Sequence, residues 1–306
     1  MLKAENAEFI HLCYNPQELQ STQIMTGELF VRFKFLTLFA VLLLTGGTFV
    51  FAQGITQKPA EKTTKESKKA EDKTKKVDLT KEATAEQVAE SLIYIYGALG
   101  GRDYLKQIRK TTIERGKISL VNAEGKTEQS NYERFVMRGD SLDKERVRFD
   151  QEYPSGKFAL IYNNDKIFGL FNEAVFAPRE DATKAFQNQI WHGLEALLRY
   201  KENGSTLTLA KREKLMGVEF HILDVTDKQN RKTRFYISTK TLRVMMLEYT
   251  QDDVKYRRKF YDYNYAQGTL VPFRTVLWAN DKQIEETNIQ TISFGQKVEE
   301  NVFKET

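Results

Sequence analysis

Two histidines lie in the part of the chain with folded patterns, and histidine is the side chain that most often acts as acid, base or metal ligand near neutral pH. His192 follows Trp191 in a segment with helical spacing, and His221 alternates with Phe220 and Ile222 in a segment with strand spacing. No second His or Cys stands at ligand spacing near either residue. We therefore interpret both histidines as structural and expect no metal site.

Other catalytic signatures are also missing from the sequence. It contains no Gly-x-Ser-x-Gly and no His-Glu-x-x-His motif, and its single cysteine, Cys13, lies far upstream of the patterned segments. The carboxylate pairs Asp252–Asp253 and Glu285–Glu286 are adjacent in turns or strands, so their side chains diverge and we expect them to be solvated. We expect no catalytic residue, no enzymatic activity and no cofactor.

One segment, 256–261, interleaves basic and aromatic residues as nucleic-acid-binding strands do. Strand alternation divides it into one face with Tyr256, Arg258 and Phe260 and a second face with the three residues between and after them. Stacking groups and phosphate-binding groups would then not line one groove. We expect no nucleic-acid partner.

The N-terminal region has the features of a secretory signal peptide. Arg32 and Lys34 precede an apolar run over 35–44, which is too short for a comfortable membrane span. Val50 and Ala52 occupy the two positions where signal peptidase needs small residues, so cleavage is expected after Ala52. Because no cysteine follows the cleavage site, we expect neither lipid attachment nor disulfides, and a soluble periplasmic monomer.

Composition completes the division of the chain. Of 306 residues, 41% are hydrophobic, and the formal net charge is +5, with 47 Lys plus Arg against 42 Asp plus Glu. The segment 53–82 holds nine Lys against six acids and few large apolar residues, so it cannot offset its ordering entropy by burial. We predict four parts: a mis-called N-terminal extension at 1–24, a signal peptide at 25–52, a disordered Lys-rich linker at 53–82, and one domain at 83–306.

The domain is expected to be mainly β with some α. Helical spacing begins near Ala83 and returns over 182–201, while period-two alternation and short turns fill most of the rest. Short turns imply sequential antiparallel neighbours. We predict a curved antiparallel sheet of about eleven strands that forms a half-open barrel covered by helices.

One face of that sheet is rich in apolar and aromatic residues, and Met suits a surface that fits variable apolar partners. The predicted lining of an apolar cavity is Phe158, Leu160, Phe220, Ile222, Phe235, Ile237, Met245, Leu247 and Phe260. The predicted lid is the central helix, through Trp191, Leu194 and Leu198. A core packed between sheet and helices would show the same composition, so composition leaves both interpretations open.

Several segments resemble the LolA-like superfamily of outer-membrane lipoprotein-sorting proteins. The matching segments are Ala98–Ile113, Met216–Ile222, Phe235–Leu242, Tyr261–Tyr263 with Gly268, Val271–Arg274, and Val302–Phe303. The sequence departs from the family pattern at Ser238, Val244 and Lys304, where Asp, Pro and Pro are usual. All of these motifs are structural turns and strand pairings, so they specify the fold better than the function.

The resemblance implies a half-open barrel whose cavity takes up lipoprotein acyl chains or another lipid and delivers them toward the outer membrane. It also implies membrane-associated donor and acceptor proteins and an arginine that closes the lid. Arg102, Arg109 and Arg115 stand near the expected position, and no motif selects one of them. The alternative is a non-transport envelope binding module whose barrel core is filled by its own side chains.

Overall fold

The computed structural model describes residues 83–98, 100–121, 125–154 and 156–305. The predicted N-terminal extension, signal peptide and Lys-rich linker all lie outside these residues. In the described part of the chain, no helix is long and apolar enough to cross a membrane. Among the same residues, no group of three or more His, Cys, Asp or Glu side chains could hold a metal ion.

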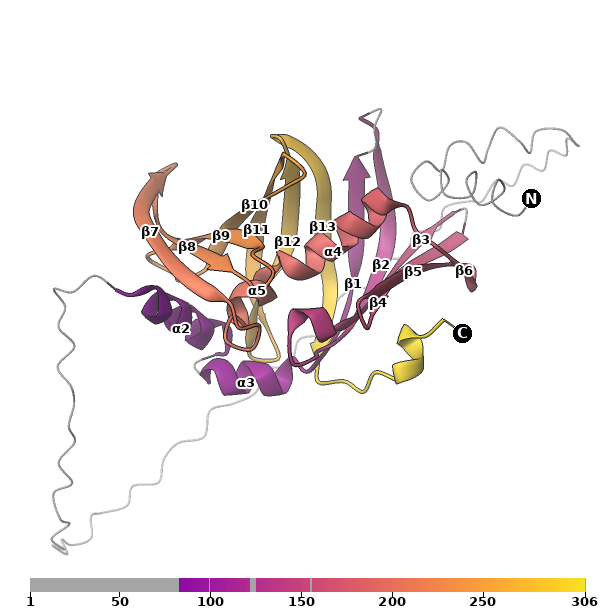
Figure 1. The fold of residues 1–306 in the computed structure, drawn as a ribbon, viewed down its shortest axis with the longest axis horizontal. Coiled ribbons are helices and arrows are strands. Elements are labelled where there is room, and N and C mark those ends of the chain that lie inside the picture. Colours follow the sequence, from indigo (N-terminus) through magenta and orange to yellow (C-terminus); the bar gives the residue numbers. More distant parts are fainter. Residues whose placement is uncertain (1–82, 99, 122–124, 155, 306) are drawn as a thin grey trace, which may run out of the picture. The chain divides into compact units, whose positions relative to one another are not determined.

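A single antiparallel sheet dominates the described residues (Figure 1). Its strands are β1 (Thr111–Val121), β2 (Thr127–Met137), β3 (Arg146–Tyr153), β4 (Gly156–Asn163), β5 (Lys166–Phe171), β6 (Ala174–Phe176), β7 (Thr206–Leu215), β8 (Val218–Thr226), β9 (Lys232–Ser238), β10 (Val244–Gln251), β11 (Val254–Ala266), β12 (Thr269–Ala279) and β13 (Lys282–Phe294). The strand order is β6-β5-β4-β3-β2-β1-β13-β12-β11-β10-β9-β8-β7, so the sheet does not close. This confirms the predicted curved, half-open sheet with helices.

Tight hairpins fix the register between many of these strands. The two-residue turns at 164–165, 252–253 and 280–281 are all built from Asn or Asp with positive φ values, between 44° and 65°. Asn and Asp tolerate this left-handed backbone, which matches the twist of the flanking strands. The sequence therefore encodes these sheet neighbours locally.

Two strands were not predicted. β6 has only three residues, and β7 is an edge strand whose side chains from Lys211 to Leu215 are all exposed. An edge strand with an exposed, charged half has no apolar alternation to reveal it. The structure therefore has thirteen strands in its described residues, where about eleven were expected.

The helices are α2 (Ala85–Tyr96), α3 (Gly101–Ile108), α4 (Glu180–Trp191) and α5 (Leu194–Leu198), with short 3-10 turns η2 (Leu142–Lys144) and η3 (Glu300–Phe303). α2 begins with a capping box, in which Thr84 and Gln87 exchange side-chain to backbone hydrogen bonds of 2.9 and 3.2 Å. The structure has two helices where one central helix was predicted over 182–201. The helical conformation is interrupted at His192, the C-cap of α4, and Gly193, the N-cap of α5.

We call the side of the sheet that α2, α4 and α5 cover the helix face. Buried side chains of α2 and α5, including Leu92 and Leu197, pack there with Leu223, Phe235 and Leu247 of β8, β9 and β10. Toward the other end of the sheet, Phe186 and Ile190 of α4 pack with β1 to β4. Figure 1 shows α4 lying across the sheet near β12, β13 and β1.

The opposite side, which we call the outer face, is partly covered by the end of the chain. Phe303 in η3 is fully buried and packs with Ile161, Phe168 and Leu170 of β4 and β5. Near the other end of the sheet, Phe220, Ile222 and Tyr236 form a smaller apolar cluster on this face. The sheet therefore buries apolar side chains on both of its faces.

Candidate functional site

The nine residues predicted to line one cavity fall into three groups. Phe158, Leu160 and Phe260 lie on the helix face and border open space. Phe235, Ile237 and Leu247 lie on the same face, but they are fully buried under α2 and α5. At this end the interior is filled by the protein's own side chains.

The other three predicted lining residues lie on the outer face. Phe220, Ile222 and Met245 cluster with Tyr236, whose Cα pairs with that of Ile222. Their neighbours Leu223 and Phe235 point to the helix face. The single-face assignment was therefore wrong for these three residues, because β8 buries side chains on both faces and an irregularity in β10 puts Met245 out of step with Val244 and Leu247.

The predicted lid residues do not form one helical stripe. Trp191 ends α4 and packs under the guanidinium of Arg231, whose central carbon is 3.9 Å from the indole ring centroid. Leu194 and Leu198 belong to α5 and pack with the cluster under α2. The residues of α4 that face the sheet include Phe186 and Gln189, and both line the open space between this helix and the sheet.

An open groove runs between α4 and the sheet, with a volume of about 870 Å³. Its apolar lining includes Ile118, Leu120, Phe149, Leu160, Phe186, Tyr249, Tyr256, Leu277 and Ile284. Arg258, Glu285 and Gln189 add polar groups on the inner side, and charged residues of α4 and the β10–β11 turn lie at the entrance. The groove therefore has a mainly apolar lining, with polar groups at its inner end.

A second space of about 200 Å³ adjoins the groove, because Phe186, Gln189 and Arg258 line both. Its walls combine apolar side chains such as Phe260 with four arginines and three glutamates: Arg109, Arg134, Arg138, Arg258, Glu114, Glu145 and Glu195. We call this space the charged cavity. The sequence predicted an apolar interior and did not predict these charged groups within it.

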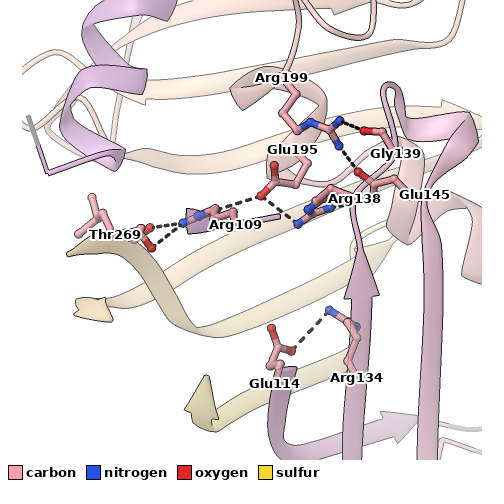
Figure 2. Close-up of polar contacts among 10 residues, drawn as sticks. Arg109, Glu114, Arg134, Arg138, Gly139, Glu145, Glu195, Arg199 and Thr269 are labelled. Atoms are coloured by element: carbon pink, nitrogen blue, oxygen red, sulfur yellow. Dashed lines mark hydrogen bonds and ion pairs between the residues drawn. The ribbon is translucent and has the colours of Figure 1, made fainter. Parts of the chain in front are cut away.

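Element ends supply most of the charges at one end of the charged cavity (Figure 2). Arg109 caps α3 and its Nη1 contacts Glu195 Oε1 of α5 at 2.9 Å, while Arg138, just after β2, contacts the same oxygen at 3.2 Å. Arg138 also bonds Glu145 at 2.7 Å, and Glu145 pairs with Arg199. These bonds tie α3, β2 and α5 together.

The strands supply the remaining charges across the middle of the sheet. Tyr132 donates a 2.7 Å hydrogen bond to Glu114, and Arg134 lies 3.5 Å from the same carboxylate oxygen. Arg258 on β11 pairs with Glu285 on β13 at 3.1 Å. Glu285, which the sequence predicted to be solvated, is therefore buried, because its strand turns it toward the helix face.

Gln189 joins α4 to this charged row. Its side-chain oxygen accepts a 3.2 Å hydrogen bond from Arg134, and its side-chain nitrogen donates a 3.4 Å bond to Glu285. Both distances are at the long end for hydrogen bonds, so each contributes little. At this point α4 is held to the sheet by weak polar contacts that a ligand can replace.

The surroundings set the ionisation of the buried groups. Burial raises the pKa of Glu195, but Arg138 and Arg109 outweigh it and hold that pKa at about 2, so the carboxylate is charged near neutral pH. Burial and the neighbouring Glu114 carboxylate raise the pKa of Tyr132 far above its usual value, so its hydroxyl remains a donor.

His192 and His221 take no part in the groove. Burial lowers the pKa of His192 to about 4, and its Nδ1 lies 2.7 Å from Thr233 Oγ1 while its ring stacks on Tyr249. Burial also lowers the pKa of His221. These contacts fit the structural role expected for His192.

Of the three arginines near the expected lid position, only Arg109 lines the charged cavity. Arg102 bonds Glu90, Glu202 and the carbonyl of Leu198, and Arg115 is largely exposed. Sequence reasoning missed the charged cavity, although alternation already placed Arg258 on the face of Tyr256 and Phe260. A charged residue at a strand position that alternation assigns to the apolar face was the sequence feature that could have predicted this cavity.

No known family model matches the sequence, and no curated protein is similar to it. Solved structures are similar in fold. A DUF1329 family protein from Desulfovibrio piger has 12% identity, with 72% of this chain and 98% of that chain covered and a TM-score of 0.52. A LolA superfamily protein from Nitrosomonas europaea has 10% identity, with 73% and 98% covered and a TM-score of 0.51. The chain therefore has a LolA-like fold, as the sequence resemblance predicted.

Proposed function

We propose that this protein is a periplasmic carrier that binds an acyl chain of a lipoprotein or another lipid and delivers it toward the outer membrane. The observation that supports it is the apolar groove of about 870 Å³ between α4 and the open sheet. Each methylene removed from water contributes about 0.8 kcal/mol, so a chain of a dozen methylenes binds by area without directed chemistry. The LolA-like fold and the signal-peptide features at 25–52 agree with this role.

The described residues offer no arrangement that favours catalysis. The titratable groups of the charged cavity are arginines and glutamates engaged with each other, which suits fixed recognition better than proton transfer. We infer that the protein is not an enzyme. Release of cargo then needs movement of α4 or an acceptor, and we place the donor and acceptor proteins at the membranes.

Leu120 provides a test of the groove. It is half-buried, lies on the helix face and lines the groove, whereas its neighbour Ser119 points to the other face. Leu120→Asp should weaken binding of a fluorescent fatty acid at least about tenfold, because a carboxylate would have to be desolvated against the chain. Ser119→Asp is the matched control and should bind as the wild type does.

Circular dichroism on the same samples separates loss of binding from loss of fold. If both variants fold and bind equally, the groove is not the lipid site. One observation favours the alternative, a non-transport envelope binding module: the half of the helix face under α2 and α5 is filled by side chains such as Phe235 and Ile237. That alternative replaces the carrier if the wild-type protein binds no apolar probe.

A further inference from the structure

The charged cavity holds more positive than negative charge. Its lining and the direct ion-pair partners of that lining comprise five arginines, Arg109, Arg134, Arg138, Arg199 and Arg258, and four glutamates, Glu114, Glu145, Glu195 and Glu285. Arginine does not lose its proton in proteins, so one positive charge has no carboxylate of its own. A buried charge without a full partner is costly, and an incoming anion would offset that cost.

The surplus lies at one end of the charged cavity. Arg134 pairs with Glu114 and Arg258 pairs with Glu285, which leaves Arg109, Arg138 and Arg199 to share Glu145 and Glu195. Figure 2 shows these three arginines converging on the two carboxylates.

Hydrogen-bonding groups at the same end are also unused. Thr112 is only 5% exposed and lines the charged cavity, and its hydroxyl has no hydrogen-bond partner in the described part of the chain. The Nε atoms of Arg109 and Arg138 are likewise buried without a partner among the described residues. Buried polar groups are normally satisfied, so a hydroxyl and two guanidinium donors left over around a positive surplus indicate a ligand oxygen.

The apolar groove and the charged cavity meet at Arg258, Gln189 and Phe186. We propose that the cargo is an anionic amphiphile, with its apolar chain in the groove under α4 and its acidic head group, a carboxylate or phosphate, in the charged cavity. The proposal rests on the proposed carrier function and specifies the chemical class of its ligand. The weak bonds of Gln189 to Arg134 and Glu285 are the contacts that the entering head group displaces.

The first test compares ligands that share one chain, by competition against a neutral fluorescent probe on the wild-type protein. Dodecyl phosphate and dodecanoate should bind at least about tenfold tighter than dodecanol. Equal affinities would overturn the head-group proposal and leave the carrier function standing. If no dodecyl compound binds, the carrier function itself fails. Inorganic phosphate at the same concentrations should not compete, and competition by it would overturn the requirement for a chain.

Charge variants test where the head group binds. Arg138→Met leaves Arg109 with Glu195 and Arg199 with Glu145, so the preference for dodecyl phosphate over dodecanol should fall to about onefold. Glu195→Gln enlarges the positive surplus and should raise the preference above the wild-type ratio. Arg234→Met is the control, because Arg234 pairs with Asp224 away from the charged cavity and its loss should keep the wild-type ratio. The same ratio in all four proteins would overturn the assignment of the site.

Discussion

Charged side chains in the interior between the sheet and the helices must each have an oppositely charged partner nearby. Removing one member of a buried ion pair costs about 3–5 kcal/mol, because the remaining charge stays desolvated. Glu145 illustrates the point: it is 2% exposed and is enclosed by Arg138 and Arg199. We therefore expect this interior to favour a ligand that carries a hydrogen-bonding group over a purely apolar one, which would leave these residues as they are.

His192 contributes to the pH dependence of stability. Its pKa is about 4 in the folded chain and about 6.5 when unfolded, because burial disfavours the charged ring. Between these values the unfolded chain binds the proton and the folded chain does not. The contribution of His192 to stability is therefore complete above about pH 6.5 and is lost as the pH drops toward 4, by up to about 3 kcal/mol.

Urea unfolding at a series of pH values from 7.5 to about 4.5 measures this slope. His192→Gln should make it shallower, and His221, whose pKa is also lowered, should account for part of what remains. The Glu195 carboxylate, with its pKa held at about 2, loses its contribution only below about pH 4.5, so the two windows separate. Identical slopes for wild type and His192→Gln would contradict the assignment.

At the scale of elements, local sequence patterns predicted most of the strands. They did not predict which face of the sheet each side chain points to, because some strands are buried on both faces. Asn–Asp and Asp–Asp turns at 164–165 and 252–253 mark hairpins that a reader of the sequence can place. By contrast, six consecutive residues of β8, from Phe220 to Val225, are buried, so period-two alternation could not separate its faces. The charged cavity depends on contacts between distant segments such as Arg109 and Glu195, which no local pattern encodes.

The C-terminal turn η3 acts as a cover for the outer face. Phe303 is fully buried against Ile161 and Phe168, and its carbonyl accepts a 3.1 Å hydrogen bond from Asn163. Phe303→Ala should lower the free energy of unfolding by about 3–4 kcal/mol, since it removes a large side chain from a packed cluster. Lys304→Ala, at the exposed neighbour, should change it by less than about 0.5 kcal/mol. Urea denaturation of both variants measures the difference, and equal stabilities would show that η3 contributes nothing to the core.

For the folded domain as a whole, the two ends of the helix face differ in how firmly they are closed. Under α2 and α5 the interior is packed, and the buried ion pair Arg138–Glu195 holds α5 to the end of β2. Over the groove, α4 is held by the long bonds of Gln189 and by an exposed ion pair, Lys184–Asp252 at 3.0 Å, besides the packing of Phe186 and Ile190. Exposed ion pairs contribute about 1 kcal/mol or less, so we expect α4 to open at a lower cost than α2 or α5.

Lys184 and Asp252 allow this opening to be blocked. Both side chains are exposed, and they bridge α4 to the β10–β11 turn across the groove entrance. Cysteines at both positions, in a chain with Cys13→Ser, can be joined by a short bis-maleimide, because the distance spanned by a lysine–aspartate pair exceeds the reach of a disulfide.

The cross-linked protein should take up a fatty-acid probe at least about tenfold more slowly than the same protein before cross-linking, and a probe loaded beforehand should be retained. Each single-cysteine variant treated with the same reagent is the control and should exchange the probe at the wild-type rate. The reason is geometric, since the groove is covered on one side by α4 and on the other by the sheet, so a chain that enters past α4 needs the helix to move. Unchanged uptake by the cross-linked protein would show that cargo enters from another side, and α4 would then be a fixed wall of the groove.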